Sequence, residues 1–347
     1  MIASLRIISP GLSTTIQDLG RPGFQRFGVS VGGALDPVAL QSANMLVGNP
    51  ANTGALEVLY VGPTFAVEAQ DVRLAFVGAQ AAIEILSDAE ATIGTAVAPM
   101  QSVRVRRGQV VRVGSLKNGA SLYIAIEGGL AIAPVLGSVA TDSRGRIGGW
   151  QGGALRAGDA LPLRCAVASE REEYAIEGLQ LSGPRRFRVV PGPQTDYFCD
   201  GEIERFFAEE FTVGAGSNRM GLRLEGRPLR HRGGFDIVSD AVVSGSIQVP
   251  GNGQPIVLLA DRQTTGGYPK IATVISADLP ALGRLPIGAK AAFAPVTMEA
   301  AAAARRELFA AIAELPDKIV RVPPPPSAVA ARLSECNLIS GVYDAAA

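Results

Sequence analysis

Glycine and proline interrupt this chain so often that most segments between them are long enough only for a strand. The sequence contains 41 glycines and 23 prolines. The intervening runs are rich in Val, Ile and Leu, as in residues 72–77, 109–113, 121–126, 187–190 and 272–275. Short, regularly spaced strands bounded by turn residues are typical of antiparallel sandwiches and barrels. The sequence therefore predicts a mainly β fold rather than alternating βαβ units.

Three segments nevertheless carry helical signals. Asp36 is a good N-cap, Pro37 a good first helical residue and Gly48 a good stop, so we expect a helix between them. A second helix is expected over residues 202–210 and a third, alanine-rich one over 298–314. The third helix carries an apolar stripe that we expect to pack on the second domain. The stripe consists of Leu308, Phe309, Ile312 and Leu315.

A chain of 347 residues is long for one domain and natural for two. A charged stretch followed by turn residues, between 166 and 184, marks the expected boundary. We expect an N-terminal β-barrel domain at 1–175 and a C-terminal β-barrel domain with a trailing helix at 176–320. Residues 321–347 are expected to form a stiff, proline-rich linker and a tail, whose apolar segment docks on another chain.

Composition argues against several functional classes. Lys+Arg and Asp+Glu are equal at 32 each, so nothing indicates a nucleic-acid or membrane partner. No apolar run approaches the roughly 18 residues of a membrane span. A single histidine, His231, excludes a histidine-rich metal site, and we expect no metal. Three scattered cysteines and the lack of a signal-peptide core favour the cytoplasm.

Three patterns imitate known motifs without satisfying them. Ser30 lies in a G-x-S-x-G string, but a serine nucleophile needs a histidine base, and His231 stands far off in a polar stretch. Residues 283–290 approximate a phosphate-binding loop, with the lysine one position late and the Ser or Thr missing. Residues 214–221 place their third glycine too late for a dinucleotide fingerprint. We therefore expect no nucleotide site in this chain.

Residues 248–270 hold the most informative group of polar side chains. The apolar run 256–260 has the size of one buried strand, and polar residues lie at both of its ends. We interpret them as a site for a small, hydrogen-bonding substrate, with a plain hairpin as the alternative. The candidates are Gln248, Gln254, Asp261, Gln263, Thr264, Thr265, Gly266, Gly267, Tyr268 and Lys270.

Four residues elsewhere are further candidates for substrate binding: Arg21, Asn44, Asn218 and Arg219. Arg21 could bind a carboxylate bidentately, or pair with Asp18 and fix its turn. Asn44 falls on the buried side of the first helix, where it could contact a ligand or cap carbonyl groups. Arg219 is a candidate for anion binding, with a surface ion pair as the alternative.

Several strings, in order along nearly the whole chain, together resemble one family. They are Gln17-Asp-Leu-Gly-Arg21, Ala43-Asn-Met-Leu-Val-Gly-Asn49, Ala125-Ile-Glu-Gly-Gly129, the residues 217–224, and the Gln-Thr-Thr-Gly-Gly-Tyr string within 261–270. They resemble the KipA or allophanate-hydrolase-subunit-2-like family, also called the biotin-dependent carboxyltransferase family. The family includes the C subunit of 5-oxoprolinase and half of the carboxyltransferase domain of urea carboxylase. The chain departs from the family pattern at Ser30, Gly153 and 283–284.

The resemblance implies two cyclophilin-like β-barrel domains with a few short helices. It implies the KipA-like C subunit of an ATP-dependent 5-oxoprolinase complex that opens 5-oxo-L-proline to L-glutamate. The partners would be a KipI-like B subunit plus a LamB/YcsF-like A subunit, with ATP used by the complex and no cofactor bound by this chain. Two alternatives stay open. One is the carboxyltransferase subunit of a urea-carboxylase-like enzyme, supplied by carboxybiotin on a separate carrier, and the other is a regulatory protein that binds a KipI-like kinase inhibitor.

Both family chemistries act on an amide or ureido group, whose resonance must be broken. The expected catalytic residues are Asp261, Lys270 and Tyr268. Lys270 and Tyr268, with amide and hydroxyl donors nearby, would stabilise charge on the carbonyl oxygen. Asp261 would orient or deprotonate an N–H if burial raised its pKa. The alternative is that Asp261 pairs with Arg262 or Lys270 and only holds the loop.

Overall fold

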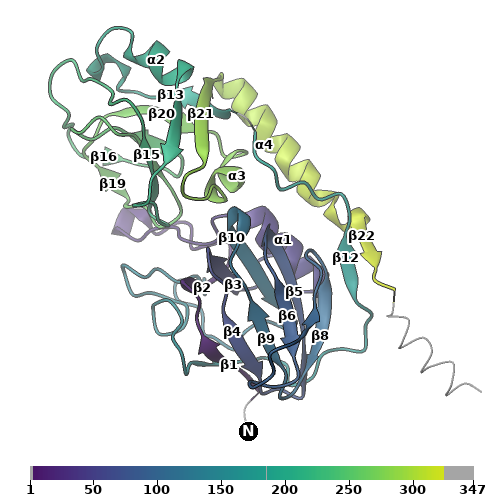
Figure 1. Ribbon diagram of the computed structural model, residues 1–347. Helices are drawn as coiled ribbons and strands as arrows, with labels where there is room; N and C mark the ends of the chain where they lie inside the picture. Colours follow the sequence, from purple (N-terminus) through teal and green to yellow (C-terminus); the bar gives the residue numbers. More distant parts are fainter. Residues whose placement is uncertain (1–2, 185, 324–347) are drawn as a thin grey trace, which may run out of the picture.

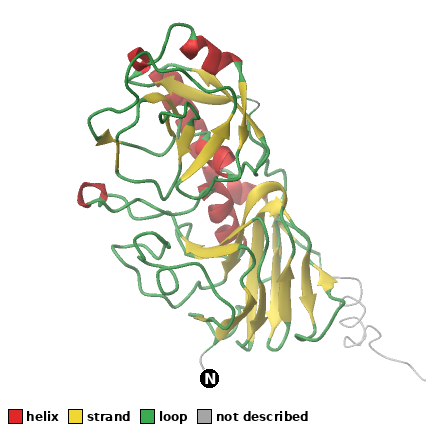
Figure 2. Ribbon diagram, turned by 60° about the vertical axis from the view of Figure 1, so that its left-hand side comes forward, coloured by secondary structure: helices red, strands yellow, loops and turns green. Residues whose placement is uncertain are grey.

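The computed structural model describes residues 3–184 and 186–323. Within them the chain forms two β domains, and the long helix α4 (Met298–Ala313) runs along one side of the molecule (Figure 1). Figure 2 shows α4 passing behind the region where the domains meet, with long loops in front of it. The predicted mainly β fold is confirmed. In this described part of the chain, no helix combines the length and apolar character needed to cross a membrane.

The N-terminal domain consists of two antiparallel sheets that pack face to face. The first contains, in order, β11 (Ala160–Pro162), β1 (Ser4–Ser9), β4 (Thr64–Val67), β9 (Val110–Val113), β6 (Ile83–Leu86) and β7 (Thr95–Ala96). The second contains β2 (Ser13–Gln17), β3 (Ala55–Leu59), β10 (Lys117–Ile126), β5 (Asp71–Gln80) and β8 (Ser102–Arg106). Ile7 and Phe65 of the first sheet meet Leu74 and Ile124 of the second in one apolar core.

The second sheet is covered on its other face by α1 (Pro37–Leu46), and a separate apolar cluster lies between them. Burial on both faces explains why β5 and β10 read as nearly continuous apolar runs. Asp36 begins the helix as predicted, because its side chain accepts the backbone N–H groups of Val38 and Ala39 at 3.0 and 3.1 Å.

The C-terminal domain is a closed barrel. Its strands, in order around the barrel, are β13 (Phe187–Pro191), β20 (Lys270–Val274), β17 (Ser246–Gln248), β18 (Ile256–Leu258), β15 (Gly221–Glu225), β14 (Glu210–Val213) and β21 (Lys290–Pro295). Only the β13–β21 pair is parallel among these described strands. The predicted second helix is α2 (Glu202–Ala208), whose Phe206 stacks on Phe293 with ring centroids 5.0 Å apart. Aromatic packing therefore fills this core.

Shorter elements connect the two domains and decorate the barrel. They are η1 (Gln25–Phe27), η2 (Thr195–Tyr197), α3 (Leu279–Gly283), η3 (Leu315–Lys318), β12 (Tyr174–Ile176), β22 (Ile319–Arg321), β16 (Asp240–Ala241) and β19 (Thr265–Gly266). The helix α3 was not predicted. After α4, β22 pairs with β12, which brings the chain back beside the N-terminal domain. The expected docking tail, 337–342, lies outside the described residues.

The apolar stripe on α4 differs from its prediction. Leu315 is buried, but Phe309 is 55% exposed. Leu308, Phe309 and Ile312 border a cavity of about 390 Å³ that residues of α1 and α3 also line. The expectation that the whole stripe packs on the second domain is wrong, because residues 3–184 and 186–323 leave this space between the three helices unfilled.

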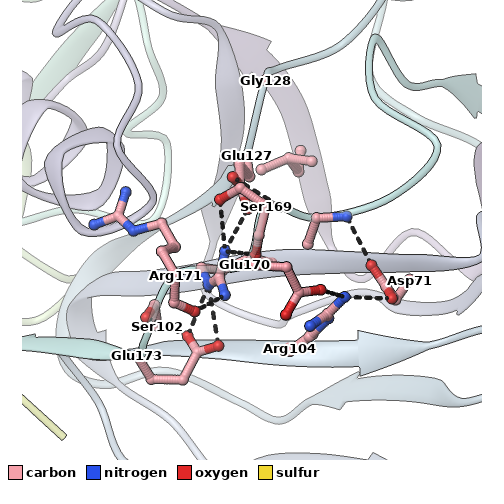
Figure 3. A network of polar contacts seen from close by, with 12 residues as sticks. Asp71, Ser102, Arg104, Glu127, Gly128, Ser169, Glu170, Arg171 and Glu173 are labelled. Atoms are coloured by element: carbon pink, nitrogen blue, oxygen red, sulfur yellow. Dashed lines mark hydrogen bonds and ion pairs between the residues drawn. The ribbon is translucent and has the colours of Figure 1, made fainter.

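Buried polar contacts fix the charged stretch that marked the expected domain boundary (Figure 3). Arg73 of β5 is only 1% exposed, and its guanidinium donates to Glu127 at 2.6 Å and to Glu173 at 3.0 Å. It also donates to the backbone carbonyl groups of Ser169 and Arg171. The segment leaving the N-terminal domain is thus held against the second sheet.

The two domains contact each other directly. Asp36, which caps α1, also accepts a hydrogen bond from Arg284 of the C-terminal domain. The backbone N–H of Ala120 donates to the carbonyl of Arg284 at 2.8 Å, and that of Gly32 donates to the carbonyl of Ala260 at 3.2 Å. The segment before α1 therefore lies against the end of β18, where the candidate site begins.

Candidate functional site between the two domains

Asp261 lies three residues beyond the end of β18, and its carboxylate faces Gly32 in the segment before α1. Its position is set by backbone pairing, since the N–H of Leu259 donates to Met220 at 2.9 Å and the N–H of Asp261 donates to Arg219 at 3.0 Å. This pairing runs the segment after β18 alongside the loop before β15. The carboxylate of Asp261 and the guanidinium of Arg219 are thereby brought together.

Arg219 joins two carboxylates from different domains. Its Nε and Nη2 donate to the two oxygens of Asp261, both at 2.8 Å, and its Nη1 donates to Glu57 of β3. Its Nη2 also donates to the carbonyl of Gly33 at 2.6 Å. Asp261 therefore pairs with neither Arg262 nor Lys270, and the sequence-based alternative that it does so is wrong. The surface ion pair considered for Arg219 is also wrong, because Arg219 is 8% exposed.

Glu57 anchors this ion triad to the N-terminal domain. It is fully buried and accepts the backbone N–H of Leu35 at 2.9 Å and the hydroxyl of Tyr123 at 2.6 Å. The same hydroxyl accepts the backbone N–H of Asp36 at 2.8 Å. Every oxygen of Glu57 is thus occupied, which fixes the guanidinium of Arg219 before any ligand arrives.

Burial and charge shift the pKa values of this group. Burial raises the pKa of Asp261 above its usual value of 3.8, opposed by Arg219 and reinforced by the nearby charge of Glu57. Burial would lower the pKa of Arg219, but Asp261 and Glu57 outweigh it and the net change is upward. Burial, and then the charge of Glu57, raises the pKa of the Tyr123 hydroxyl well above 10.0. A raised pKa in a carboxylate that borders a cavity is a common feature of functional sites.

Two cavities meet at Asp261. The first, which we name the interdomain cavity, has a volume of about 380 Å³ and is bordered by Leu35 and Leu59 from one domain and by Asn218 and Arg219 from the other. The second, which we name the arginine cavity, has a volume of about 350 Å³. Its lining includes Ser30, Asp142, Arg144, Arg262, Gln263, Thr264 and Thr265. Asp261 and Arg144 border both cavities.

Comparison with known proteins assigns the chain to a family. The family described as "Carboxyltransferase domain, subdomain A and B" matches residues 27–295, which span the C-terminal barrel strands, most of the N-terminal domain and the whole ion triad. The chain belongs to this carboxyltransferase family. The resemblance inferred from its sequence strings is thereby confirmed.

Relatives fall into two groups. The chain is 39% identical to the C subunit of 5-oxoprolinase from Escherichia coli over 304 residues, covering 87% of this chain and 94% of that protein. It is 32% identical to urea amidolyase of Saccharomyces cerevisiae, covering 90% of this chain but only 18% of that protein. The solved structure of Kluyveromyces lactis urea amidolyase matches with a TM-score of 0.82 at 26% identity, over 94% of this chain and 21% of that chain.

Six of the candidate residues border the two cavities of this carboxyltransferase fold. Asn218, Arg219 and Asp261 border the interdomain cavity, and Asp261, Gln263, Thr264 and Thr265 border the arginine cavity. Gln248 lies one step behind them, where its Oε1 accepts from Gln263 at 3.3 Å. Gly266 packs against the side chain of Gln248, and a Cβ at this position would clash with Nε2 of Gln248.

Four other candidates from residues 248–270 border neither cavity. Lys270 is buried and its Nζ donates to Asp240 of β16 at 2.6 Å. Tyr268 is 38% exposed, and neither it, Lys270 nor Gly267 borders either cavity. Gln254 lies at the opposite end of β18, where its side chain bonds the backbone N–H and carbonyl of Gly226 at 3.0 and 2.9 Å. Gln254 therefore stands apart from the polar residues that follow β18, whereas Gln248 contacts them through Gln263.

The two N-terminal candidates make structural contacts. Arg21 is 1% exposed and donates to the carbonyl of Ala140, rather than to Asp18, so the expected pairing is wrong. Its Nη1 and the Oδ1 of Asp261 lie 3.3 and 3.9 Å from the point where a Cβ on Gly32 would stand. Asn44 donates to the carbonyl of Thr53 at 2.7 Å and accepts from Asn49 at 3.1 Å, which holds the loop after α1.

Several residues at the site were not proposed from the sequence. Ser30, dismissed as a nucleophile, donates its hydroxyl to Asp142 at 2.9 Å, and both border the arginine cavity. Glu57 is an acid flanked by apolar residues within a strand, which is a rare enough setting to have marked it as a candidate. Arg144 stands in a glycine-rich stretch that gave no specific signal. No three His, Cys, Asp or Glu side chains among residues 3–184 and 186–323 are placed to hold a metal ion.

Proposed function

We propose that this chain is the KipA-like C subunit of an ATP-dependent 5-oxoprolinase complex, which opens 5-oxo-L-proline to L-glutamate. The observation that carries the proposal is the match to the C subunit of the Escherichia coli enzyme along 94% of that protein. The partners in this proposal are a KipI-like protein and a LamB/YcsF-like protein, and ATP is consumed by the assembled complex. The scattered cysteines support a cytoplasmic location.

Asp261 is the residue that handles the amide in this proposal. It borders both cavities, so a small cyclic amide in either one can place its N–H against the carboxylate. A raised pKa brings a buried carboxylate closer to the range in which it can exchange a proton with substrate. Arg219 and Glu57 hold it in place, so the carboxylate does not have to reorganise during the reaction.

Some of the remaining candidates line the arginine cavity beside this carboxylate, and others support that wall from behind. Thr264 and Thr265 place hydroxyl donors on the wall of the arginine cavity, where they can bind a carbonyl oxygen. Gln248 supports Gln263 from behind. We assign Lys270 a positioning role, because it binds Asp240 of β16, and β16 pairs with β19, the strand that contains Thr265. Tyr268 stands on the exposed edge of the same segment and contacts substrate only if a partner protein covers it.

Reconstitution tests the function. The full chain is purified with its KipI-like and LamB/YcsF-like partners, and ATP hydrolysis is measured together with glutamate release from 5-oxoproline. The proposal expects both activities to require all three proteins and to remain coupled. A complex that assembles but releases no glutamate, and instead transfers a carboxyl group when carboxybiotin is supplied, would show the proposal to be wrong.

That contrary outcome corresponds to a second candidate function, the carboxyltransferase subunit of a urea-carboxylase-like enzyme. It is favoured by the structural match to Kluyveromyces lactis urea amidolyase over 94% of this chain. The chain spans only 21% of that protein, so its other activities would have to come from separate partners. The distinguishing substrate is urea, which is neutral, whereas 5-oxoproline carries a carboxylate.

A further inference from the structure

Arg262 borders the arginine cavity, and its buried guanidinium has no carboxylate partner among the described residues. Arg262 is only 4% exposed, yet its Nη1 donates to the hydroxyl of Ser244 at 2.9 Å and its Nε to the carbonyl of Val242 at 3.4 Å. Burial lowers the pKa of Arg262, with no acidic neighbour in this part of the chain opposing the shift. Burying an uncompensated charge is costly unless a counter-charge is supplied.

A second arginine, Arg144, borders the same cavity. Arg144 is exposed, and its side chain has no hydrogen-bond or ion-pair partner within residues 3–184 and 186–323. Its loop is nevertheless well anchored. One oxygen of Asp142 accepts the backbone N–H groups of Arg144 and Gly145 at 3.1 and 2.9 Å, and the other accepts the hydroxyl of Ser30 at 2.9 Å. The backbone is thus fixed while the guanidinium stays available.

The acidic groups of the cavity do not neutralise these two arginines. Asp142 is occupied by the loop and by Ser30, and Asp261 is bound bidentately by Arg219. The rest of the wall offers hydroxyl and amide groups from Thr264, Thr265 and Gln263. Two guanidinium groups with additional neutral donors suit a ligand that presents a carboxylate. A volume of about 350 Å³ restricts that ligand to a small molecule.

We propose that the arginine cavity binds the carboxylate of the substrate, with Arg144 and Arg262 as its charge partners and Asp261 facing the amide. The inference rests on the proposed function and names the substrate class that the site selects, a small monocarboxylate that also carries an amide. With the carboxylate in the arginine cavity, the ring is directed toward the border of the two cavities, where Asp261 lies. A neutral substrate such as urea would leave both arginines without a counter-ion.

Equilibrium binding tests the inference without turnover. The full chain, alone and with its KipI-like partner, is titrated with 5-oxoproline and with its uncharged primary amide. Wild-type protein is expected to prefer the acid. Arg144→Gln should weaken binding of the acid about tenfold, as for loss of a charge-assisted hydrogen bond, and leave the amide unchanged. Arg146→Gln is the matched control, because Arg146 is exposed on the same loop but borders neither cavity.

Steady-state kinetics of the assembled complex test the carboxylate site independently of the binding measurements. Arg144→Gln should raise the KM for 5-oxoproline about tenfold with kcat nearly unchanged, because the lost contact is made equally in the ground and transition states. Arg144→Lys should recover part of the loss. Equal binding of acid and amide by wild-type protein, or equal losses in Arg144→Gln and Arg146→Gln, would overturn the inference. A complex that prefers the acid but never releases glutamate would instead sink the proposed function and leave the carboxylate site standing.

Discussion

Arg73 and Arg219 lie in similar buried ion networks, but the two networks have different roles in the molecule. Each is a nearly inaccessible arginine shared by two carboxylates, Glu127 and Glu173 in one case and Glu57 and Asp261 in the other. The groups around Arg73 all belong to the N-terminal domain and the segment that leaves it. The network around Arg73 therefore holds the segment that leaves the N-terminal domain against the second sheet.

The triad around Arg219 differs in two respects. Its carboxylates come from separate domains, and one of them, Asp261, borders two cavities. A buried ion pair alone is therefore no sign of a functional site, since Arg73 has one as well. What distinguishes Asp261 is that a tuned, rigidly held carboxylate is left open to a ligand. Four predictions test this contrast, in order of decreasing effect.

Arg219→Met should have the largest effect. It leaves Glu57 and Asp261 buried without a cation, which should lower the free energy of unfolding by ~3–5 kcal/mol at neutral pH. The loss should shrink in acid, because protonated carboxyl groups no longer need the guanidinium. Chemical denaturation of the full chain at several pH values measures both. A variant as stable as wild type at neutral pH would show that the triad does not hold the domains together.

Arg73→Met should destabilise less and spare the chemistry. Its partners are partly exposed, with side-chain exposures of 14% and 26%, so water can solvate them once the arginine is gone. We expect a loss of about 3 kcal/mol, the lower end of the range for broken buried pairs. At a temperature where the variant stays folded, KM and kcat for 5-oxoproline should match wild type. A large kinetic defect in the folded variant would remove the distinction between the two networks.

The pH dependence of kcat/KM should report Asp261. Because its pKa is raised, the ionised form that accepts an amide N–H is lost at higher pH than for an ordinary aspartate, and activity should fall as pH decreases through that raised value. Glu57→Gln removes a charge that raises this pKa and leaves Arg219 to Asp261 alone, so the acid limb should move to lower pH. A limb that stays in place in Glu57→Gln would assign the titration to another group.

Lys270→Met and Asp240→Asn should have the smallest effect, and the two should agree. If Lys270 acts by holding β16 through Asp240, removing either partner should lower kcat by less than about tenfold, as expected for a partly exposed ion pair. The double variant should be no worse than either single one. A catalytic Lys270 would instead make Lys270→Met far more damaging than Asp240→Asn.

The strands, α1, α2 and α4 could be predicted because local signals coincide with the fold. Asp36 and Pro37 begin α1, and the apolar runs in β5 and β10 match a sheet covered on both faces. The segment after β18 could be recognised as polar beyond what a turn requires. Asp261, Gln263, Thr264 and Thr265 accordingly stand at the cavities.

The partners of those residues could not be predicted, because they are set by how the domains meet. Glu57 is 162 positions from Arg219 along the chain, and Ser30 is 112 positions from Asp142. Sequence spacing suggested nearby Arg262 or Lys270 as the cation for Asp261. The true partner was chosen by the backbone pairing of the loop before β15 with the segment after β18. The resemblance to a family supplied the fold and the candidate function, but not this geometry.

The central claim is that chemistry takes place at Asp261. The direct test is glutamate release by the reconstituted complex carrying Asp261→Asn, with Asp240→Asn as the matched control on the exposed side of the barrel. The substitution keeps the size of the side chain and a hydrogen-bond acceptor for Arg219, so assembly should persist, while kcat should fall roughly 100-fold or more, as for loss of a general base. An assembled Asp261→Asn complex with turnover close to that of the control would contradict the account.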